Sequence, residues 1–228
     1  VAADTYDFIF KTNQPLKFAP GQYLEWTLGA KGADSRGNRR YFTIASSPTE
    51  PEIRMGVKFY SEASSFKKIL LKMKIGDTII ASQLAGEFVM PKDSKQKLAF
   101  IAGGIGVTPF RSMIKYLIDK NEQRSVVLVY SNNTKEDVAY HKVFDEAEEK
   151  LGIKTIYTLT DLKCVPNNCQ GCRGFLTADT IKKEIPDYKE RMFFVSGPHR
   201  MVVAFEQVLR DLGVNKRNIK KDFFPGFA

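Results

Sequence analysis

Three glycines and a threonine–proline pair follow one apolar run of the chain, and their spacing is suited to binding a phosphate. The run Leu98–Ala102 continues into Gly103-Gly104-Ile105-Gly106-Val107-Thr108-Pro109. Glycines allow a sharp turn and let an anion approach the backbone closely. Thr108 is expected to cap a helix that starts with Pro109, and such a helix presents free N–H groups to an anion. We therefore expect a nucleotide phosphate at Gly103, Gly104, Gly106, Thr108 and Pro109. A ligand-free strand–helix turn is the alternative, because the pattern is not G-x-G-x-x-G.

A second segment, Arg39-Arg40-Tyr41-Phe42-Thr43-Ile44-Ala45-Ser46-Ser47, combines cations, rings and hydroxyls on one expected strand. Strand alternation places Arg40, Phe42 and Ile44 on one face and Tyr41 and Thr43 on the other. An arginine in this setting can hold a phosphate bidentately while a ring packs on a planar ligand. A solvent-facing arginine on an edge strand explains the same residues equally well.

The elements around these two segments predict two kinds of domain. Short alternating runs separated by turn residues, within residues 6–10, 22–28, 40–45, 53–59 and 78–82, predict a small antiparallel β-barrel, with one helix over 65–73 capped by Ser65 or a neighbour. After residue 93 strands alternate with helices, which predicts a parallel α/β sheet that binds ligands at the carboxyl ends of its strands. We expect strands over 98–102, 126–130, 155–159, 192–196 and 219–224, and helices over 107–120, 136–150, 178–184 and 199–212. The predicted domains are residues 1–93 and 94–228.

Composition excludes several classes of protein. The chain has 228 residues and a net charge of +9, without a long basic block, so we expect no nucleic-acid partner. No apolar run is long enough to cross a membrane, and we expect a cytoplasmic location. The chain opens on Val1 instead of Met, which suggests a piece of a longer protein.

The three cysteines, Cys164, Cys169 and Cys172, lie in one short stretch. Their spacing matches the first three ligands of a plant-type [2Fe–2S] site, but the chain has no fourth cysteine. We therefore predict free thiols and no metal. His141 and His199 are expected to be ordinary surface histidines.

Four motifs together resemble those of the ferredoxin–NADP reductase-like flavoenzymes. Pro20-Gly21-Gln22-Tyr23 resembles P-G-Q-Y, and Arg40–Ser46 resembles R-x-Y-[ST]-x-x-S with Phe42 in place of Tyr. Gly103–Pro109 resembles G-G-x-G-x-x-P, and Ser196-Gly197-Pro198 resembles [C/S]-G-P. The motifs occur in family order over nearly the whole chain. Residues 156–159 and 174–176 are similar to the NADH–cytochrome reductase branch. Residues 34–39 and 222–228 are similar to reductase modules of bacterial membrane electron-transport proteins.

The resemblance implies a role for each motif. Arg40 would bind the flavin pyrophosphate together with Ser64 and Ser65, Phe42 would pack on the isoalloxazine, and Thr43 would lie near the flavin nitrogen that accepts hydride. Ser196 would act at the nicotinamide, where many members have Cys. The remaining flavin- and nucleotide-binding residues it implies are Tyr41, Val57, Lys58, Phe59, Gly197 and Pro198.

The C-terminal aromatics have a role implied in the same way. In the family a terminal aromatic often stacks on the flavin face that nicotinamide must reach, and moves aside for hydride transfer. We assign this role to Phe224, with Phe227 as the alternative.

The function implied is hydride transfer from NADH or NADPH to a bound flavin. The electrons would then pass to an acceptor protein or a membrane redox subunit. A membrane partner would place the module at the cytoplasmic face of a membrane. We expect FAD, with FMN possible. NADH is expected to be preferred, because residues 130–134 carry amides where NADP users tend to carry Arg, and Asp161 would repel a 2′-phosphate; Lys135 argues the other way. A free flavin reductase and a non-catalytic nucleotide-binding module are the alternatives.

Overall fold

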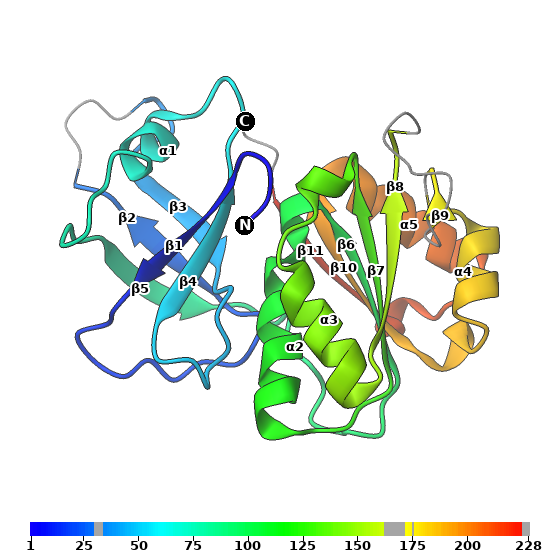
Figure 1. Cartoon of the computed structure of the whole chain (residues 1–228). Coiled ribbons are helices and arrows are strands. Elements are labelled where there is room, and N and C mark those ends of the chain that lie inside the picture. Colours follow the sequence, from blue (N-terminus) through cyan, green and yellow to red (C-terminus); the bar gives the residue numbers. More distant parts are fainter. Residues whose placement is uncertain (30–33, 162–171, 175, 225–228) are drawn as a thin grey trace.

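The computed structural model describes residues 1–29, 34–161, 172–174 and 176–224, with the backbone alone for residues 172, 173, 223 and 224. Two parts lie side by side, an antiparallel β part and a parallel sheet flanked by helices (Figure 1). This is the fold class that the sequence predicts. None of the helices in the described part of the chain has the length and apolar character to cross a membrane.

The antiparallel part is built from five strands and one short helix. These are β1 (Thr5–Phe10), β2 (Tyr23–Thr27), β3 (Arg39–Thr43), β4 (Ile53–Lys58), α1 (Ser65–Leu70) and β5 (Ile80–Ala85). Strand β1 pairs with β4, while β3, β2 and β5 form a second sheet in that order. Alternating side chains from both sheets and from α1 meet in one apolar core that includes Trp26, Met55 and Phe66. Among the described residues the predicted barrel is therefore two antiparallel sheets packed around a common core.

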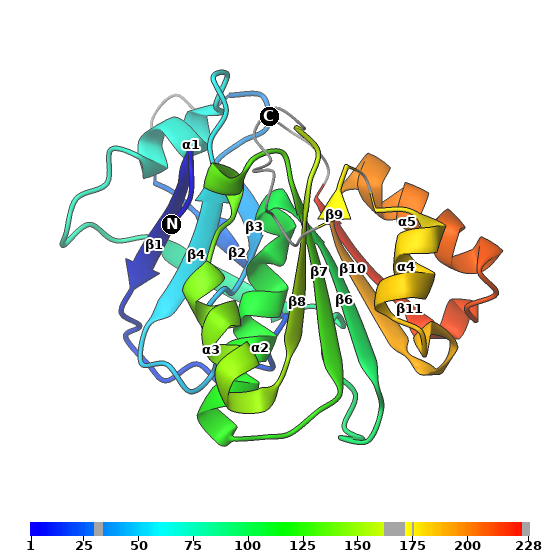
Figure 2. The same cartoon turned by 45° about the vertical axis from the view of Figure 1, so that its right-hand side comes forward.

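The second part is a six-stranded parallel sheet with the order β11-β10-β6-β7-β8-β9. Its strands are β6 (Leu98–Gly103), β7 (Val126–Asn132), β8 (Lys154–Leu159), β9 (Cys172–Arg173), β10 (Met192–Pro198) and β11 (Ile219–Phe224). Its helices are α2 (Thr108–Lys120), α3 (His141–Leu151), α4 (Ala178–Glu184) and α5 (His199–Asp211). Helices α2 and α3 cover one face, and α4 and α5 cover the other (Figure 2). Each face therefore has its own apolar core.

Helix α2 lies between the parallel sheet and the antiparallel part (Figure 1). The core on this face of the sheet includes Ala45 and Phe88 from the antiparallel part as well as Phe110 from α2. The antiparallel strands end at Ala85 and the parallel strands begin at Leu98, so the predicted boundary after residue 93 falls in the connection between them. That boundary stays a prediction.

Two helix starts differ from the sequence prediction. Residues Gly104–Val107 already form a 3-10 turn, so Val107 is the N-cap of α2 and Thr108 is its first residue; the Thr108 hydroxyl donates to the Ile105 carbonyl at 3.2 Å. Helix α3 starts at His141, later than predicted, because Tyr140 has a left-handed backbone (φ 61°) that interrupts the helix.

Candidate functional site

The strand order places a switch point between β6 and β10. From β6 the chain moves outward through β7, β8 and β9, and it then returns to the other side of β6 through β10 and β11. In such sheets ligands bind outside the carboxyl ends of the strands at the point where the order reverses. The two neighbouring strand ends are Gly103 and the segment Ser196-Gly197-Pro198, which are two of the predicted nucleotide motifs.

The loop 103–109, here called the nucleotide loop, has three glycines, of which Gly106 is packed against backbone atoms and Gly104 has a left-handed conformation. A Cβ on Gly106 would come within 2.5 Å of the Ser196 carbonyl oxygen and 2.6 Å of the Gly197 Cα. A Cβ on Gly103 would come within 2.2 Å of the Met201 sulfur. Gly104 has a left-handed backbone with φ 50°. The glycines thus let the nucleotide loop lie directly against the end of β10, which brings the two motifs together.

Buried hydroxyls without partners lie at the same edge of the sheet. Ser196 Oγ and Thr158 Oγ1 are fully buried and make no hydrogen bond among the described residues. Leaving a buried polar group unpaired costs about 1–3 kcal/mol, so such groups are uncommon unless a ligand or water completes them. The sequence identifies Ser196 through its motif, whereas Thr158 carries no signal in the sequence.

Asp222 lies on β11 directly opposite Ser196. It lines a groove of about 480 Å³ at the junction of the two parts, together with Tyr23, Phe88 and Lys220. Burial raises the pKa of the Asp222 carboxyl to about 6. Sequence reasoning missed this residue because an aspartate on a terminal strand gives no indication of its burial.

On the other side of the junction, strand β3 presents the predicted flavin residues in alternation. Thr43 is buried and lies opposite Tyr23 on β2, while Tyr41 is exposed and its ring meets the Tyr23 ring edge-on at 5.6 Å. A hydrogen bond to Glu25 raises the pKa of the Tyr41 hydroxyl. Phe42, on the opposite face, is half-buried and packs on Phe66 of α1 with ring centroids 5.9 Å apart.

Arg40 reaches the start of α1 and meets a carboxylate there. Its guanidinium donates to the carbonyls of Arg36 at 2.8 Å and Gly37 at 3.1 Å and lies 3.5 Å from Asp34 Oδ1. The other oxygen, Asp34 Oδ2, accepts from the Ser65 backbone N–H at 3.0 Å. The N–H of Ser65, helped by Arg36, lowers the pKa of Asp34 well below its usual value.

We call Arg40, Ser64, Ser65 and Asp34 the Arg40 cradle. Ser64 caps α1 by accepting from the Lys67 N–H. The three residues predicted to bind the flavin pyrophosphate, Arg40, Ser64 and Ser65, therefore lie close together, and the Asp34 carboxylate lies among them. Asp34 was not predicted, since an aspartate before an Arg-Gly pair is an ordinary turn residue.

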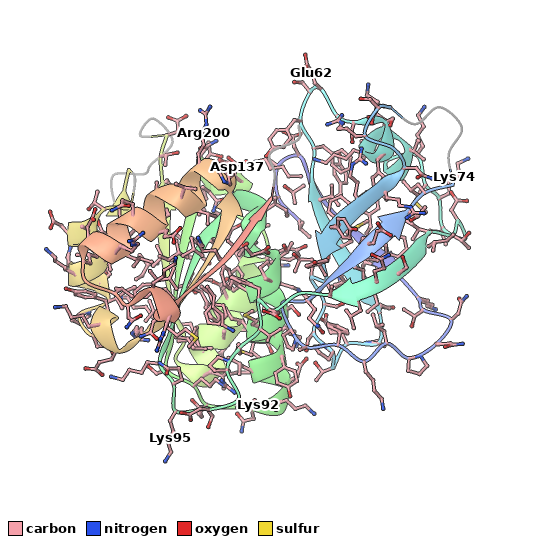
Figure 3. All side chains as sticks on the ribbon, turned by 180° about the vertical axis from the view of Figure 1, so that it is seen from behind. Glu62, Lys74, Lys92, Lys95, Asp137 and Arg200 are labelled. Carbon is pink, nitrogen blue, oxygen red and sulfur yellow. The ribbon has the colours of Figure 1, made fainter. Side chains whose placement is uncertain are left out.

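The segment Val57–Phe59 lies at the end of β4. Val57 and Phe59 are buried in the core of the antiparallel part. Lys58 forms an ion pair with Asp137 at 2.6 Å, which joins the two parts of the molecule. Asp137 lies at the upper end of the parallel sheet, on the side of the antiparallel part, and Arg200 at the start of α5 lies at the same end (Figure 3).

Several predicted residues fall beyond what the structure describes. Phe227 and the cysteines Cys164 and Cys169 lie outside the described residues, and only the backbone is described for Phe224 and Cys172. The backbone of Phe224 lies opposite Pro198, at the carboxyl end of β11. The roles of Phe224 and Phe227 and the absence of a metal at the cysteines stay predictions.

Comparisons with known proteins agree on the kind of module. A family model for the oxidoreductase NAD-binding domain matches residues 100–207. The chain is 26% identical over 223 residues to flavohemoprotein A of Dictyostelium discoideum, covering 91% of this chain and 52% of that protein. It is 26% identical over 231 residues to the glycine betaine monooxygenase reductase subunit of Chromohalobacter salexigens, covering 98% of this chain and 62% of that protein. The chain thus spans roughly half to three fifths of these relatives.

Solved structures show the same fold. The FAD/NAD-binding domain of nitric oxide dioxygenase from Vibrio cholerae matches with a TM-score of 0.85 and 19% identity, covering 98% of this chain and 93% of that one. A ferredoxin NADP⁺ reductase from Neisseria gonorrhoeae with bound FAD and NADP matches with a TM-score of 0.79 and 18% identity, covering 98% and 93%. Each match covers 98% of this chain and therefore includes both parts shown in Figure 1.

Proposed function

We propose that the chain is an FAD-dependent NAD(P)H oxidoreductase module of the ferredoxin–NADP reductase-like family, which takes hydride from NADH onto bound FAD and passes electrons to a redox partner. A bound flavin would accept two electrons from the nucleotide and release them one at a time. The part that falls to the protein is binding, orientation and the exclusion of water.

One observation carries the proposal. The nucleotide loop leads directly into α2, and residues in the first turns of α2 are hydrogen-bonded to the strand end that follows Thr43. Arg111 Nη1 donates to the Ala45 carbonyl at 2.9 Å, and Ser112 Oγ donates to the Ser46 carbonyl at 2.6 Å. The two predicted cofactor sites therefore share one interface, as direct transfer between two bound rings requires.

The Arg40 cradle fits the phosphate end of a flavin nucleotide. A carboxylate already accepts from the Ser65 N–H and lies beside the Arg40 guanidinium, which is the contact set that a phosphate oxygen would take. We propose that Arg40, Ser64 and Ser65 hold the pyrophosphate of FAD, that Phe42 supports the isoalloxazine, and that Thr43 lies at its reactive edge. Tyr41, Val57, Lys58 and Phe59 border this region.

At the nucleotide side we propose that Gly103, Gly104, Gly106, Thr108 and Pro109 bind the nicotinamide nucleotide's phosphates, with Gly197 and Pro198 alongside. The unpartnered Ser196 hydroxyl is the group proposed to complete its hydrogen bond on the nicotinamide. Phe224 is proposed to cover the flavin face, since its strand ends at this same edge.

The proposed preference for NADH rests on the loop after β7. The Asp161 backbone N–H donates to the Asn133 carbonyl at 2.9 Å, which brings a carboxylate-bearing residue beside the expected ribose site. A 2′-phosphate would meet that negative charge, and the exposed Lys135 at the start of the next turn is the cation that opposes it. Steady-state kinetics with both nucleotides test the preference, and a higher kcat/KM with NADPH would refute it.

A spectrum of the purified chain tests the function. The expected protein is yellow, releases FAD identified by mass, and bleaches on anaerobic addition of NADH; ferricyanide then restores the colour. Loss of flavin during turnover would instead support a free flavin reductase. Absence of bleaching by both nucleotides in flavin-loaded protein would leave a non-catalytic nucleotide-binding module and refute the proposal.

A further inference from the structure

A buried polar network joins the antiparallel part to helix α2. Arg111 has only 5% of its surface exposed and forms a bidentate ion pair with Glu50, with Nη2 to Oε1 at 2.8 Å and Nη1 to Oε2 as the second contact. Arg54 lies 3.5 Å from Glu50 and 3.0 Å from Asp7. The Tyr140 hydroxyl donates to Asp7 at 2.9 Å and closes the network from the nucleotide side.

The network fixes the segment that follows Thr43. Arg111 donates to the carbonyl of Ala45, and its partner Glu50 accepts from the Ser47 backbone N–H at 2.7 Å. Ser112 donates to the carbonyl of Ser46 at 2.6 Å. Three consecutive residues that follow β3, Ala45, Ser46 and Ser47, are thus hydrogen-bonded to α2, directly or through Glu50.

The charges in the network are matched. Although burial by itself raises the pKa of Glu50, the hydrogen bonds from Arg111 and the Ser47 N–H and the charge of Arg54 hold that pKa below its ordinary value. Glu50 therefore stays ionised at neutral pH and remains available to Arg111.

A glycine lets the two parts come this close. Gly56 on β4 faces α2 and Tyr140, and a Cβ there would come within 2.3 Å of the Tyr140 hydroxyl and 2.9 Å of the Thr108 Cγ2. The interface is therefore close-packed as well as bonded, so its spacing is not adjustable without displacing one part.

We propose that Arg111 is a positioning residue for hydride transfer. Together with Glu50 and Ser112, it fixes the distance between the end of β3, which carries the predicted flavin residues, and the nucleotide loop. Arg111 is the fourth residue of α2 and follows the last residue of the nucleotide loop by two positions, and it donates to the backbone carbonyl two residues after Thr43. A shift at the contact of Arg111 with Ala45 or of Ser112 with Ser46 would move the expected flavin site relative to the expected nicotinamide site. This inference rests on the proposed function.

Arg191 offers a matched control. It is buried to a similar degree, with 7% exposed, and forms a bidentate pair with Asp187 at 2.6 and 3.0 Å. It also donates to a backbone carbonyl, that of Leu98, at 2.8 Å. All of these partners lie within the nucleotide part and at the amino ends of the strands, away from the candidate site.

The test compares Arg111→Met and Arg191→Met in flavin-loaded protein. Both should lower the melting temperature, because each removes a bidentate partner from a partly buried carboxylate and a hydrogen bond from a backbone carbonyl. Only Arg111→Met should slow flavin bleaching at saturating NADH, by roughly 10- to 100-fold, because misplacement by about 1 Å costs this much. Its KM for NADH should change by less than about threefold, since the nucleotide loop itself is intact.

Two further variants and an apo-protein measurement complete the design. Arg111→Lys should recover part of the rate, because one cation can reach Glu50 or Ala45 but cannot form the bidentate pair. Ser112→Ala removes a single hydrogen bond and should fold normally, with a rate loss of roughly threefold. Without any flavin, Arg111→Met should speed hydrogen exchange of the amides in residues 44–54, and Arg191→Met should not.

The inference is overturned if both methionine variants slow bleaching equally, which would indicate general loosening, or if Arg111→Met and Ser112→Ala keep the wild-type rate. Either result would leave the proposed function standing, because wild-type protein would still bleach with NADH. If wild-type protein binds flavin but does not bleach, the proposed function fails first.

Discussion

The two regions expected to bind phosphate differ in how their polar groups are occupied. In the Arg40 cradle the guanidinium and the Ser65 N–H already have partners, supplied by Asp34 and nearby carbonyls. At the sheet edge beside the nucleotide loop, Ser196 Oγ and Thr158 Oγ1 are buried and have no hydrogen-bond partner among the described residues, and burial raises the pKa of the Asp222 carboxyl. A ligand must displace an internal anion in the first region, whereas in the second it can complete groups that are already in place.

This difference predicts how each region responds to substitution. At the nucleotide side the position of the backbone matters most, because glycine packing brings the motifs together. At the flavin side the charges of individual side chains matter most, because ligand and Asp34 compete for them.

Gly106→Ala should cause the largest loss. Its Cβ would collide with backbone atoms of Ser196 and Gly197, which cannot rotate away as a side chain can. Overpacking of this kind costs about 1–3 kcal/mol. Displacing the nucleotide loop by about 1 Å should lower NADH-dependent bleaching by more than ~10-fold. Melting temperature and kcat/KM are the measurements.

Gly29→Ala is the control for that substitution, because no atom of the described residues lies within 4 Å of a Cβ at Gly29. It should leave both measurements close to wild type. If Gly106→Ala behaves like Gly29→Ala, close packing of the nucleotide loop against β10 does not set the geometry of this site.

Arg40→Ala should weaken flavin retention by about 1.5–3 kcal/mol, the value of one charge-assisted contact. Arg39→Ala on the same strand is the control, because the Arg39 side chain is 64% exposed and lies 3.7 Å from Glu25, away from the cradle. Fluorescence titration of apo-protein with FAD measures both. Equal affinity in the two variants would remove Arg40 from the flavin site.

Sequence reasoning identified what is local in the chain. The nucleotide loop, the Arg40–Ser46 strand and the Ser196-Gly197-Pro198 turn are each contiguous: glycine content and capping residues single out the loop, and resemblance to family motifs singles out the strand and the turn. The starts of α2 and α3 were misplaced, because the 3-10 turn at Gly104–Val107 and the left-handed Tyr140 depend on contacts that the local pattern does not contain.

The interactions between these segments could not be read from the sequence. Arg111 and Glu50 are 61 residues apart, and each alone is an ordinary surface residue type. The burial of Asp222 depends on β11 joining β10 at the sheet edge, and Asp34 reaches Ser65 across 31 residues. Long-range pairing of this kind is decided by the fold, not by the residue type.

Asp222→Asn should change how stability depends on pH. Because burial raises the folded-state pKa of Asp222 to about 6, the protonated carboxyl stabilises the fold at low pH, and this stability is lost as the pH rises through about 6. Asparagine carries no charge at any pH, so the variant should be more stable than wild type at pH 8, by on the order of 2 kcal/mol, with the gap closing below about pH 5. Thermal melts of apo-protein between pH 4.5 and 8 measure this. A variant that is less stable than wild type at pH 8 would mean that a cationic partner stabilises the ionised Asp222 in the folded state.

Asp34→Asn should have the smallest effect on FAD affinity, and whether the affinity rises or falls distinguishes two roles of Asp34. Asparagine keeps an oxygen that can accept from the Ser65 N–H, but it loses the charge that attracts Arg40. If Asp34 competes with the flavin phosphate for these groups, the variant should bind FAD more tightly, by up to roughly tenfold, because a neutral acceptor forms a weaker contact than a charged one. The control is Asp77→Asn, whose carboxylate accepts from the Lys74 N–H at 2.8 Å in a turn that follows α1. Titration of apo-protein with FAD measures both variants. Weaker binding by Asp34→Asn would show that the carboxylate orients Arg40 for the ligand, and the contrast between an occupied cradle and an open sheet edge would then no longer hold.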